Sequence, residues 1–176
     1  MNKKSLILAG RWKDRGLVWL RINGKGSFQN SPELRDFVVQ MLEEGEAHFV
    51  IDLEECPVMD STFMGTLTGI ARRLFRIEGG RLEVVNANPR NKNLMQSLGL
   101  DQIFDLDTDG KSWSSEREAI SRQLQEQVAP VELSKKEQTE FVLKAHEQLA
   151  EADDSNVPRF KDVIDYLRKE LREAEA

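Results

Sequence analysis

The sequence of 176 residues has little cysteine and histidine, with one Cys and two His residues. The single cysteine, Cys56, excludes a disulfide within the chain and fits a reducing compartment, so we expect a cytoplasmic protein. No Cys/His cluster is present, so the sequence predicts no metal site and no cofactor. No apolar run approaches the roughly 20 residues needed to cross a bilayer, so we expect no membrane insertion.

The first ten residues, MNKKSLILAG, have only a faint likeness to a signal peptide. The apolar run covers residues 6–9 and is followed by Arg11, whereas a signal peptide needs an apolar core of roughly 7–15 residues. We interpret this segment as an edge strand.

The charge is unevenly distributed along the chain, whose net charge is −6. Residues 1–112 hold 15 Lys and Arg against 16 Asp and Glu, and residues 113–176 hold 10 against 15. An acidic tail argues against nucleic-acid binding, which needs a basic surface. A solvated helical surface is the simplest interpretation of this tail.

Residues 48–77 form the most informative stretch, with the sequence HFVIDLEECPVMDSTFMGTLTGIARRLFRI. An apolar run, His48 to Ile51, predicts a buried strand, and the turn-like Glu54-Glu55-Cys56-Pro57 follows. From Asp60 on, apolar residues recur every three or four positions, which predicts a long amphipathic helix that ends before Gly79. The apolar positions are Phe63, Met64, Leu67, Ile70, Ala71, Leu74 and Phe75.

Asp60, Ser61 and Thr62 are therefore expected at a helix N-terminus near the carboxyl end of a strand. One interpretation is capping, in which their side chains accept hydrogen bonds from free N–H groups for about 1 kcal/mol. The other is a phosphorylation switch. A hydroxyl on the first turn is expected to be exposed, and a phosphate there would meet free N–H groups and the positive end of the helix dipole.

This segment resembles the STAS domain of bacterial anti-sigma-factor antagonists, in which a strand and an Asp-Leu pair precede an Asp-Ser-Ser/Thr-Gly-Leu-Gly type motif that opens a helix. The matching residues here are Asp52-Leu53 and the run from Met59 to Gly65. In that family the Ser after the motif Asp is phosphorylated by a partner kinase, which implies Ser61, with Thr62 as a second choice. The resemblance implies a partner-binding surface made of Asp60, Ser61, Thr62, Phe63 and Met64. Phe63 departs from the family pattern, where Gly is common.

Flanking segments predict alternating strands and helices. Strands are expected over residues 6–11, 16–22, 81–85 and 100–106, and helices over 32–44, capped by Ser31, and 89–98. The order predicts an α/β fold with a mixed sheet, parallel after the first hairpin, and it is similar to the STAS fold over residues 5–107. Gly65 and Gly69 are expected to let the long helix approach the sheet closely.

The tail lies outside the resemblance, so we expect a STAS domain over residues 1–110 and a helical extension over 111–176. A helix capped by Ser114 or Ser115 is predicted to carry Ile120, Leu124 and Val128 and to end before Pro130. A capping box, Ser134 to Glu137, then opens the first of two amphipathic helices that form a hairpin. The hairpin is expected to fold back on the chain, to pair with a second copy as a homodimer, or to hold a partner helix. His146 is expected at the surface.

Three functions compete. The first is an anti-sigma-factor antagonist of a partner-switching pathway, with a serine kinase that is also the anti-sigma factor and a matching phosphatase as partners. The second is a phosphorylation-independent STAS scaffold in a signalling or transport assembly. The third, an enzyme, is disfavoured because no Gly-x-Ser-x-Gly elbow is present and few histidines exist to serve as a base for Ser61.

Overall fold

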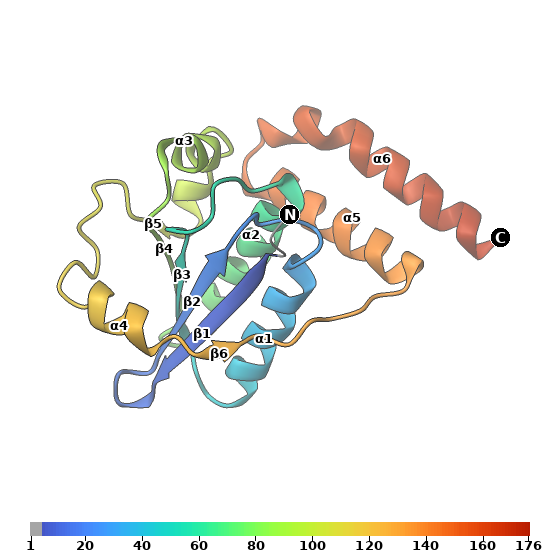
Figure 1. Cartoon of the computed structure of the whole chain (residues 1–176). Helices are drawn as coiled ribbons and strands as arrows, with labels where there is room; N and C mark the ends of the chain where they lie inside the picture. The colour runs from blue at the N-terminus through green and yellow to red at the C-terminus, as the bar shows by residue number, and fades with distance from the viewer. Residues whose placement is uncertain (1–4) are drawn as a thin grey trace.

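The computed structural model describes residues 5–176 and contains one mixed sheet with helices on both faces (Figure 1). The four residues before Ser5, which belong to the segment weighed as a signal peptide, lie outside the described part. The strands are β1 (Leu6–Trp12), β2 (Leu17–Asn23), β3 (His48–Asp52), β4 (Arg81–Val85), β5 (Asp105–Leu106) and β6 (Glu126–Gln127). The helices are α1 (Ser31–Glu43), α2 (Ser61–Phe75), α3 (Pro89–Ser97), α4 (Arg117–Gln123), α5 (Lys135–Ala152) and α6 (Asn156–Glu175).

The sheet has the strand order β5-β4-β3-β2-β1-β6. β1 and β2 form an antiparallel hairpin, while β2, β3, β4 and β5 pair in parallel. This arrangement confirms the predicted mixed α/β fold with parallel pairing after the first hairpin.

Side chains of the central strands alternate between two apolar clusters, as the two-residue period of a strand requires. On β2, Val18 and Leu20 face the larger cluster, which α1, α2 and α3 cover, whereas Leu17 and Trp19 face the smaller one. The smaller cluster lies under α4, whose Ile120 is buried there. Both faces of the sheet are therefore covered, which explains why the central strands are mostly apolar.

Several local predictions were wrong. The N-terminal strand is not at the edge, because β6 pairs with β1 through Leu8 and Ala9. The helix expected to reach Val128 ends at Gln123, because Val128 N–H donates to Ile7 O and the intervening backbone joins the sheet. A capped helix start at Ser31 is also absent: Asn30 is the N-cap residue, and the buried Ser31 hydroxyl donates to Ser27 O at 2.6 Å.

The strand predicted over residues 100–106 is mostly a turn. A 3-10 turn covers Leu100–Gln102, and β5 spans only Asp105–Leu106. Phe104 N–H donates to Leu100 O at 3.1 Å, so both buried side chains face the core from one helical turn. The apolar residues of this segment therefore follow the period of a helical turn and not that of a strand.

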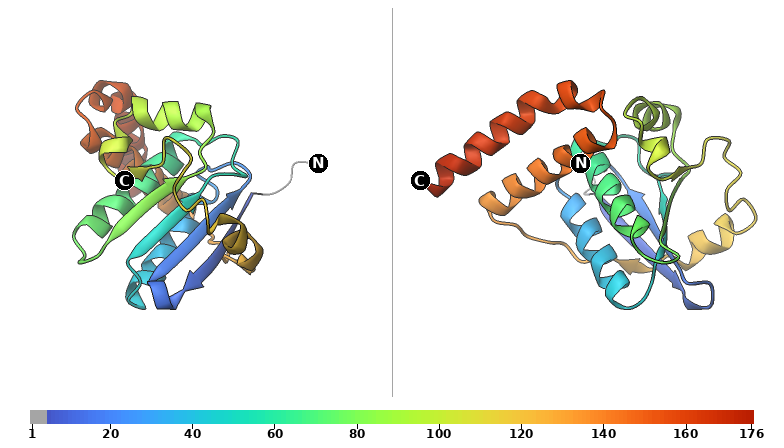
Figure 2. Two further views of the ribbon diagram at one scale, coloured as in Figure 1. Left: turned by 90° about the vertical axis from the view of Figure 1, so that its left-hand side faces the viewer. Right: turned by 180° about the vertical axis from the view of Figure 1, so that it is seen from behind.

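α5 and α6 form an antiparallel hairpin that folds back on the chain, one of the three arrangements considered (Figures 1 and 2). The predicted capping box is confirmed: Glu137 N–H donates to Ser134 Oγ, and Ser134 N–H donates to Glu137 Oε1. α5 lies against α2, while α6 packs on α5 and its C-terminal end extends away from the sheet.

Candidate functional site: the start of α2 and the helix that covers it

The start of α2 is fixed by Asp60, which confirms the capping interpretation of that residue. Asp60 Oδ1 accepts a hydrogen bond from Phe63 N–H at 2.9 Å, and Oδ2 accepts one from Phe28 N–H at 2.9 Å. Asp60 N–H donates to Gly26 O at 2.9 Å. The loop after β2 and the loop before α2 are therefore held together at the carboxyl end of the parallel strands.

Phe63, which departs from the family motif, is fully buried in the larger apolar cluster. A Cβ atom placed on Gly26 would lie 2.9 Å from Phe63 Cδ1. The aromatic ring thus occupies space that the glycine of the neighbouring loop leaves open. Thr62 and Met64 are also buried, with 4% and 2% exposure, so these three residues support the helix start from inside.

Ser61 is half-buried, which differs from the exposed hydroxyl that was expected. Its Oγ lies 2.8 Å from His146 Nε2, and His146 Nδ1 lies 2.7 Å from Val142 O. A carbonyl can only accept, so Nδ1 carries a proton, and in this tautomer of the imidazole Nε2 accepts the hydrogen bond of the Ser61 hydroxyl. His146 is only 5% exposed and its ring packs edge-on against Phe160 of α6, so the expectation of a surface position was wrong.

α5 passes closest to α2 at Gly65. A Cβ atom on Gly65 would come within 2.1 Å of Ala145 O, whereas one on Gly69 would lie 3.5 Å from Gln148 Cγ. The small residue is therefore needed for contact between two helices, not for contact between helix and sheet as expected. Further along, Arg72 donates to Gln148 Oε1 at 2.8 Å and pairs with Glu151.

A cavity of about 380 Å³ opens between α1, α2 and α5. Arg35, Arg73 and Lys144 line it, together with Gly69 and Phe141. Arg35 also stacks on the Phe141 ring, 4.7 Å from its centroid. Ser61 is not among the lining residues, so the cavity does not bring a small molecule to its hydroxyl.

The Ser61–His146 pair has the first two members of a nucleophile and base arrangement. One of the two histidines therefore lies within reach of Ser61 as a base, although it comes from a helix 85 positions further along the chain. The pair faces a closed helix–helix contact, and Asp60 points its carboxylate to two backbone N–H groups. This geometry is that of a hydrogen bond that holds α5 in place. It is not that of a catalytic dyad.

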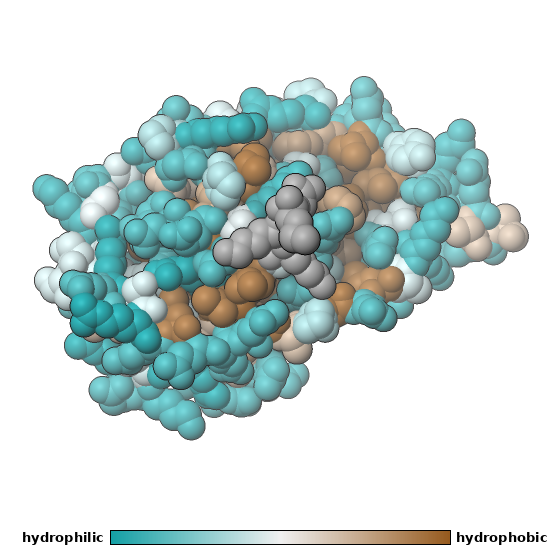
Figure 3. Space-filling view, viewed as in Figure 1, coloured by the Kyte–Doolittle hydropathy of each residue, from teal (hydrophilic) through white to brown (hydrophobic). Residues whose placement is uncertain are grey.

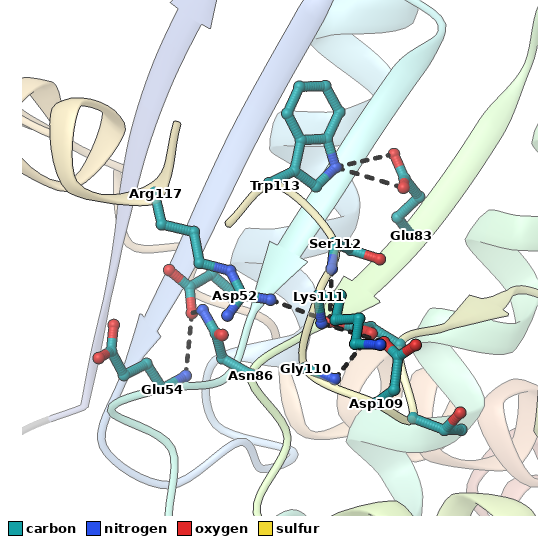
Figure 4. A network of polar contacts seen from close by, with 12 residues as sticks. Asp52, Glu54, Glu83, Asn86, Asp109, Gly110, Lys111, Ser112, Trp113 and Arg117 are labelled. Atoms are coloured by element: carbon teal, nitrogen blue, oxygen red, sulfur yellow. Dashed lines mark hydrogen bonds and ion pairs between the residues drawn. The ribbon is translucent and has the colours of Figure 1, made fainter. Parts of the chain in front are cut away.

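A second polar cluster lies at the carboxyl end of β3 and on the α4 face of the sheet (Figure 4). Asp52, 1% exposed, accepts from Trp19 Nε1, Arg21 Nε, Glu54 N–H and Asn86 Nδ2 at 2.9 to 3.3 Å. All of its oxygens are occupied by donors from the chain itself, so Asp52 fixes the strand end and the next two loops.

Glu83 accepts from Trp113 Nε1 at 3.3 Å and is 2.5 Å from His48 Nε2. Burial by itself would raise the pKa of Glu83, but the hydrogen bond from His48 and the charge of Arg81 together hold this pKa below its ordinary value. The carboxylate thus stays ionised and anchors Trp113 to the sheet.

Cys56 is buried and its Sγ lies 3.4 Å from Val58 O. Burial raises the pKa of its thiol, which agrees with a packed residue and not a nucleophile. Among residues 5–176, no group of three or more His, Cys, Asp or Glu side chains is placed to hold a metal ion. No helix in that same range is long and apolar enough to cross a membrane.

A family model described as the STAS domain matches residues 13–119, which is more than half of the chain. The chain belongs to the STAS domain family. The match begins at the end of β1 and ends within α4, so the α5–α6 hairpin extends beyond the STAS domain. β6, which follows the matched segment, adds a strand to the sheet of the STAS domain.

Solved structures share this fold. An anti-sigma factor antagonist from Mycobacterium paratuberculosis aligns with a TM-score of 0.54 and 19% identity, over 70% of this chain and 97% of that one. SpoIIAA, an anti-sigma factor antagonist of Bacillus solved in its unphosphorylated form, aligns with a TM-score of 0.50 and 20% identity, over 66% of this chain and 96% of its own. At such identities the likeness establishes the STAS fold.

Proposed function

We propose that this STAS protein is a regulatory protein-interaction module of a bacterial partner-switching pathway, similar to an anti-sigma factor antagonist and acting in the cytoplasm. Ser61 is the residue that a partner serine kinase phosphorylates. The unmodified protein binds the kinase, phosphorylation releases it, and a matching phosphatase restores the bound form.

The position of Ser61 carries this proposal. It follows the capping Asp60 at the start of α2, in the place where the resemblance puts the phosphorylated Ser of the family. SpoIIAA, which shares the fold, is described in an unphosphorylated form, a term that implies a phosphorylated one. Asp60 and Ser61 are the members of the expected partner-binding set that are only half-buried, so a partner would contact these two first.

The chemistry of the step is ordinary phosphoryl transfer. Ser61 Oγ attacks the γ-phosphorus of ATP, the bond to ADP breaks, and the hydroxyl proton leaves to a base of the kinase. The phosphate would stand at the positive end of the α2 dipole and add roughly two negative charges beside Asp60. A surface that binds the neutral hydroxyl would then meet two adjacent anions, which weakens the complex.

The direct test is mass spectrometry of Ser61 in protein purified from its native cells, together with partner binding by wild-type and Ser61→Asp protein. We expect phosphate on Ser61 and loss of a co-purifying serine kinase in Ser61→Asp. Ser61→Thr is the matched control, because it keeps a hydroxyl and should retain the kinase. An unmodified Ser61 under every growth condition, with binding unchanged by Ser61→Asp, would falsify the proposal.

A phosphorylation-independent STAS scaffold is the second candidate. The hydrogen bond between Ser61 and His146 favours it, because this contact occupies the hydroxyl that a kinase needs. In a scaffold the α5–α6 hairpin would keep one arrangement in all conditions. Partner binding that is insensitive to both Ser61→Asp and Ser61→Ala would identify this case.

A further inference from the structure

The Ser61 hydroxyl is covered by the chain itself. His146 accepts its hydrogen bond at 2.8 Å, and one turn further along α2 the backbone of Ala145 lies directly on Gly65. A phosphoryl donor must approach Oγ from outside the molecule with room for three phosphate oxygens. While the imidazole stands at hydrogen-bond distance, that direction is closed.

The contacts that hold α5 and α6 in place are of two kinds. Near Ser61 they are the hydrogen bond to His146 and the close packing at Gly65. One turn beyond His146, toward the C-terminal end of α5, Leu149 is fully buried in the main cluster, and Asn156 Nδ2 donates to Leu98 O and Leu149 O at 2.9 Å. The turn between the two helices is thus anchored at the end of α3, so Ser61 is uncovered when α5 up to His146 moves away from α2 while that turn stays docked.

We propose that the α5–α6 hairpin is an intramolecular cover over the Ser61 docking surface. In the closed form it competes with any protein that needs Ser61 or the exposed side of Asp60, and a phosphate on Ser61 holds it open because the added group takes the place of the imidazole. The role of the kinase in this inference rests on the proposed function, but the cover itself is a property of the isolated chain.

The cover can be measured without any partner, by alkylation of Ser61→Cys with iodoacetamide and mass spectrometry. Ser115→Cys, on an exposed segment, supplies the uncovered rate, and the buried Cys56 of every variant reports whether the chain unfolds. We expect Cys at position 61 to react about tenfold or more slowly than Cys at position 115, since the reaction has to wait for local opening.

Two glycines of α2 provide a substitution that should push α5 away and a matched control that should not. Gly65→Ala places a methyl group against Ala145 O and forces α5 away, whereas Gly69→Ala places it at an ordinary contact distance from Gln148. Added to Ser61→Cys, the first change is expected to raise the alkylation rate about tenfold, and the second to leave it within about twofold. Equal alkylation rates in the Gly65→Ala and Gly69→Ala variants would refute the cover. So would a rate for Ser61→Cys alone as high as that of Ser115→Cys.

If Gly65→Ala unfolds the chain, Cys56 will react rapidly. In that case a disulfide that holds α5 on α2 is used in place of the Gly65→Ala change. Gln148 Cγ marks the place of a cysteine Sγ, 3.5 Å from a Cβ on residue 69, so Gly69→Cys with Gln148→Cys can form a disulfide between α2 and α5. With ATP and native cell extract, the oxidised variant should lose phosphorylation of Ser61 and recover it after reduction with dithiothreitol. Equal phosphorylation of both forms refutes the cover.

The two proposals fail in different ways. If Ser61 is covered in the alkylation experiment but is never phosphorylated in wild-type cells, the cover stands and the kinase switch fails. If Ser61 is phosphorylated equally in locked and reduced protein, the switch stands and the cover fails.

Discussion

Two parts of the chain beyond β5 cover opposite sides of the molecule, and their contacts differ in kind. The first, residues 107–128, lies on the sheet. Trp113 donates to Glu83 of β4, and Ser121 accepts from Arg21 of β2 at 2.7 Å, while within the segment Arg117 pairs with the nearly buried Asp107 at 2.9 Å. β6 then joins the sheet itself. This part is held on the sheet by the hydrogen bond of Trp113 to the buried Glu83 carboxylate, by the hydrogen bond of Arg21 to Ser121 and by backbone pairing.

The second part is the α5–α6 hairpin, which lies on a helix. Its contacts with α2 include the hydrogen bond at Ser61, the hydrogen bond from Arg72 to Gln148, the exposed Arg72–Glu151 pair, and the backbone of Ala145 packed against Gly65. An exposed ion pair contributes about 0 to 1 kcal/mol, so little here is strong. On the face seen in Figure 3, apolar residues are visible at the surface beside the hairpin, among mostly polar residues.

The difference teaches which cover can open. Removal of residues 107–128 from the sheet would expose buried carboxylates and unpaired backbone groups, both of which are costly. Separation of α5 from α2 exposes apolar surface and the Ser61 hydroxyl and breaks the partly exposed contacts of Arg72. The first cover therefore belongs to the folded core, whereas the second is suited to a switch, and each of the following variants tests this distinction.

The largest effect is expected from Trp113→Ala. The variant loses the edge-on contact with Trp19, whose ring centroid is 6.0 Å away, and the hydrogen bond to Glu83. We expect the free energy of global unfolding to fall by about 2–4 kcal/mol, as measured by urea denaturation. Phe75→Ala is the control, because Phe75 is 90% exposed and should change little. A similar loss of unfolding free energy in both variants would mean that residues 107–128 are not part of the folded core.

A smaller and local effect is expected from the Ser61–His146 pair. In a double-mutant cycle of Ser61→Ala and His146→Ala, the coupling should be about 1 kcal/mol, the usual contribution of one hydrogen bond. Hydrogen exchange of residues 135–146 is the readout, while urea denaturation of the sheet should stay unchanged. Strictly additive effects would mean that the hydrogen bond does not hold α5.

Ser134→Ala removes the cap of α5. The expected cost is about 1 kcal/mol or less, because the box is exposed and fraying of the first turn absorbs part of it. Faster exchange should be confined to the first turns of α5, with Ser155→Ala in the turn before α6 as a comparison. If exchange instead rises across the sheet, the hairpin is not a separate unit.

The smallest effect is a pH dependence of the first cover. The pKa of Glu83 is lowered from 4.5 in the folded chain, so its ionised form stabilises the fold above pH 4.5, and this contribution is lost as the pH falls through the folded pKa. Unfolding measured between pH 7 and pH 3 should therefore show a steeper loss in wild type than in Glu83→Gln. Parallel curves would mean that Glu83 does not anchor Trp113 as an anion.

Local signals in the sequence were sufficient for much of this structure. The Asp60 cap, the Ser134–Glu137 capping box and the apolar period of α2 each depend on residues a few positions apart. The structure confirms them, except that Phe75, predicted on the apolar face, is 90% exposed. The family motif added the fold. These features could be predicted because each is decided within one element.

The cover could not be predicted, because its contacts join distant parts of the chain. Nothing in the sequence around His146 indicates that it contacts Ser61, 85 positions away. The apolar stripe of a helix likewise does not indicate which surface the helix packs against. The glycine at position 65 was a usable signal, but it could be assigned to the sheet as easily as to another helix. The early end of α4 was also decided elsewhere, by pairing of β6 with β1.

The pairing of β6 with β1 has a kinetic consequence for the hairpin. Only seven residues, 128–134, connect β6 to α5, and their full extension is roughly 25 Å. A displaced hairpin therefore remains near its own surface at an effective concentration on the order of millimolar, which no dilution of the protein can change. A partner that opens the cover has to compete with the tethered hairpin for the same surface, and the closed form returns as soon as the partner leaves.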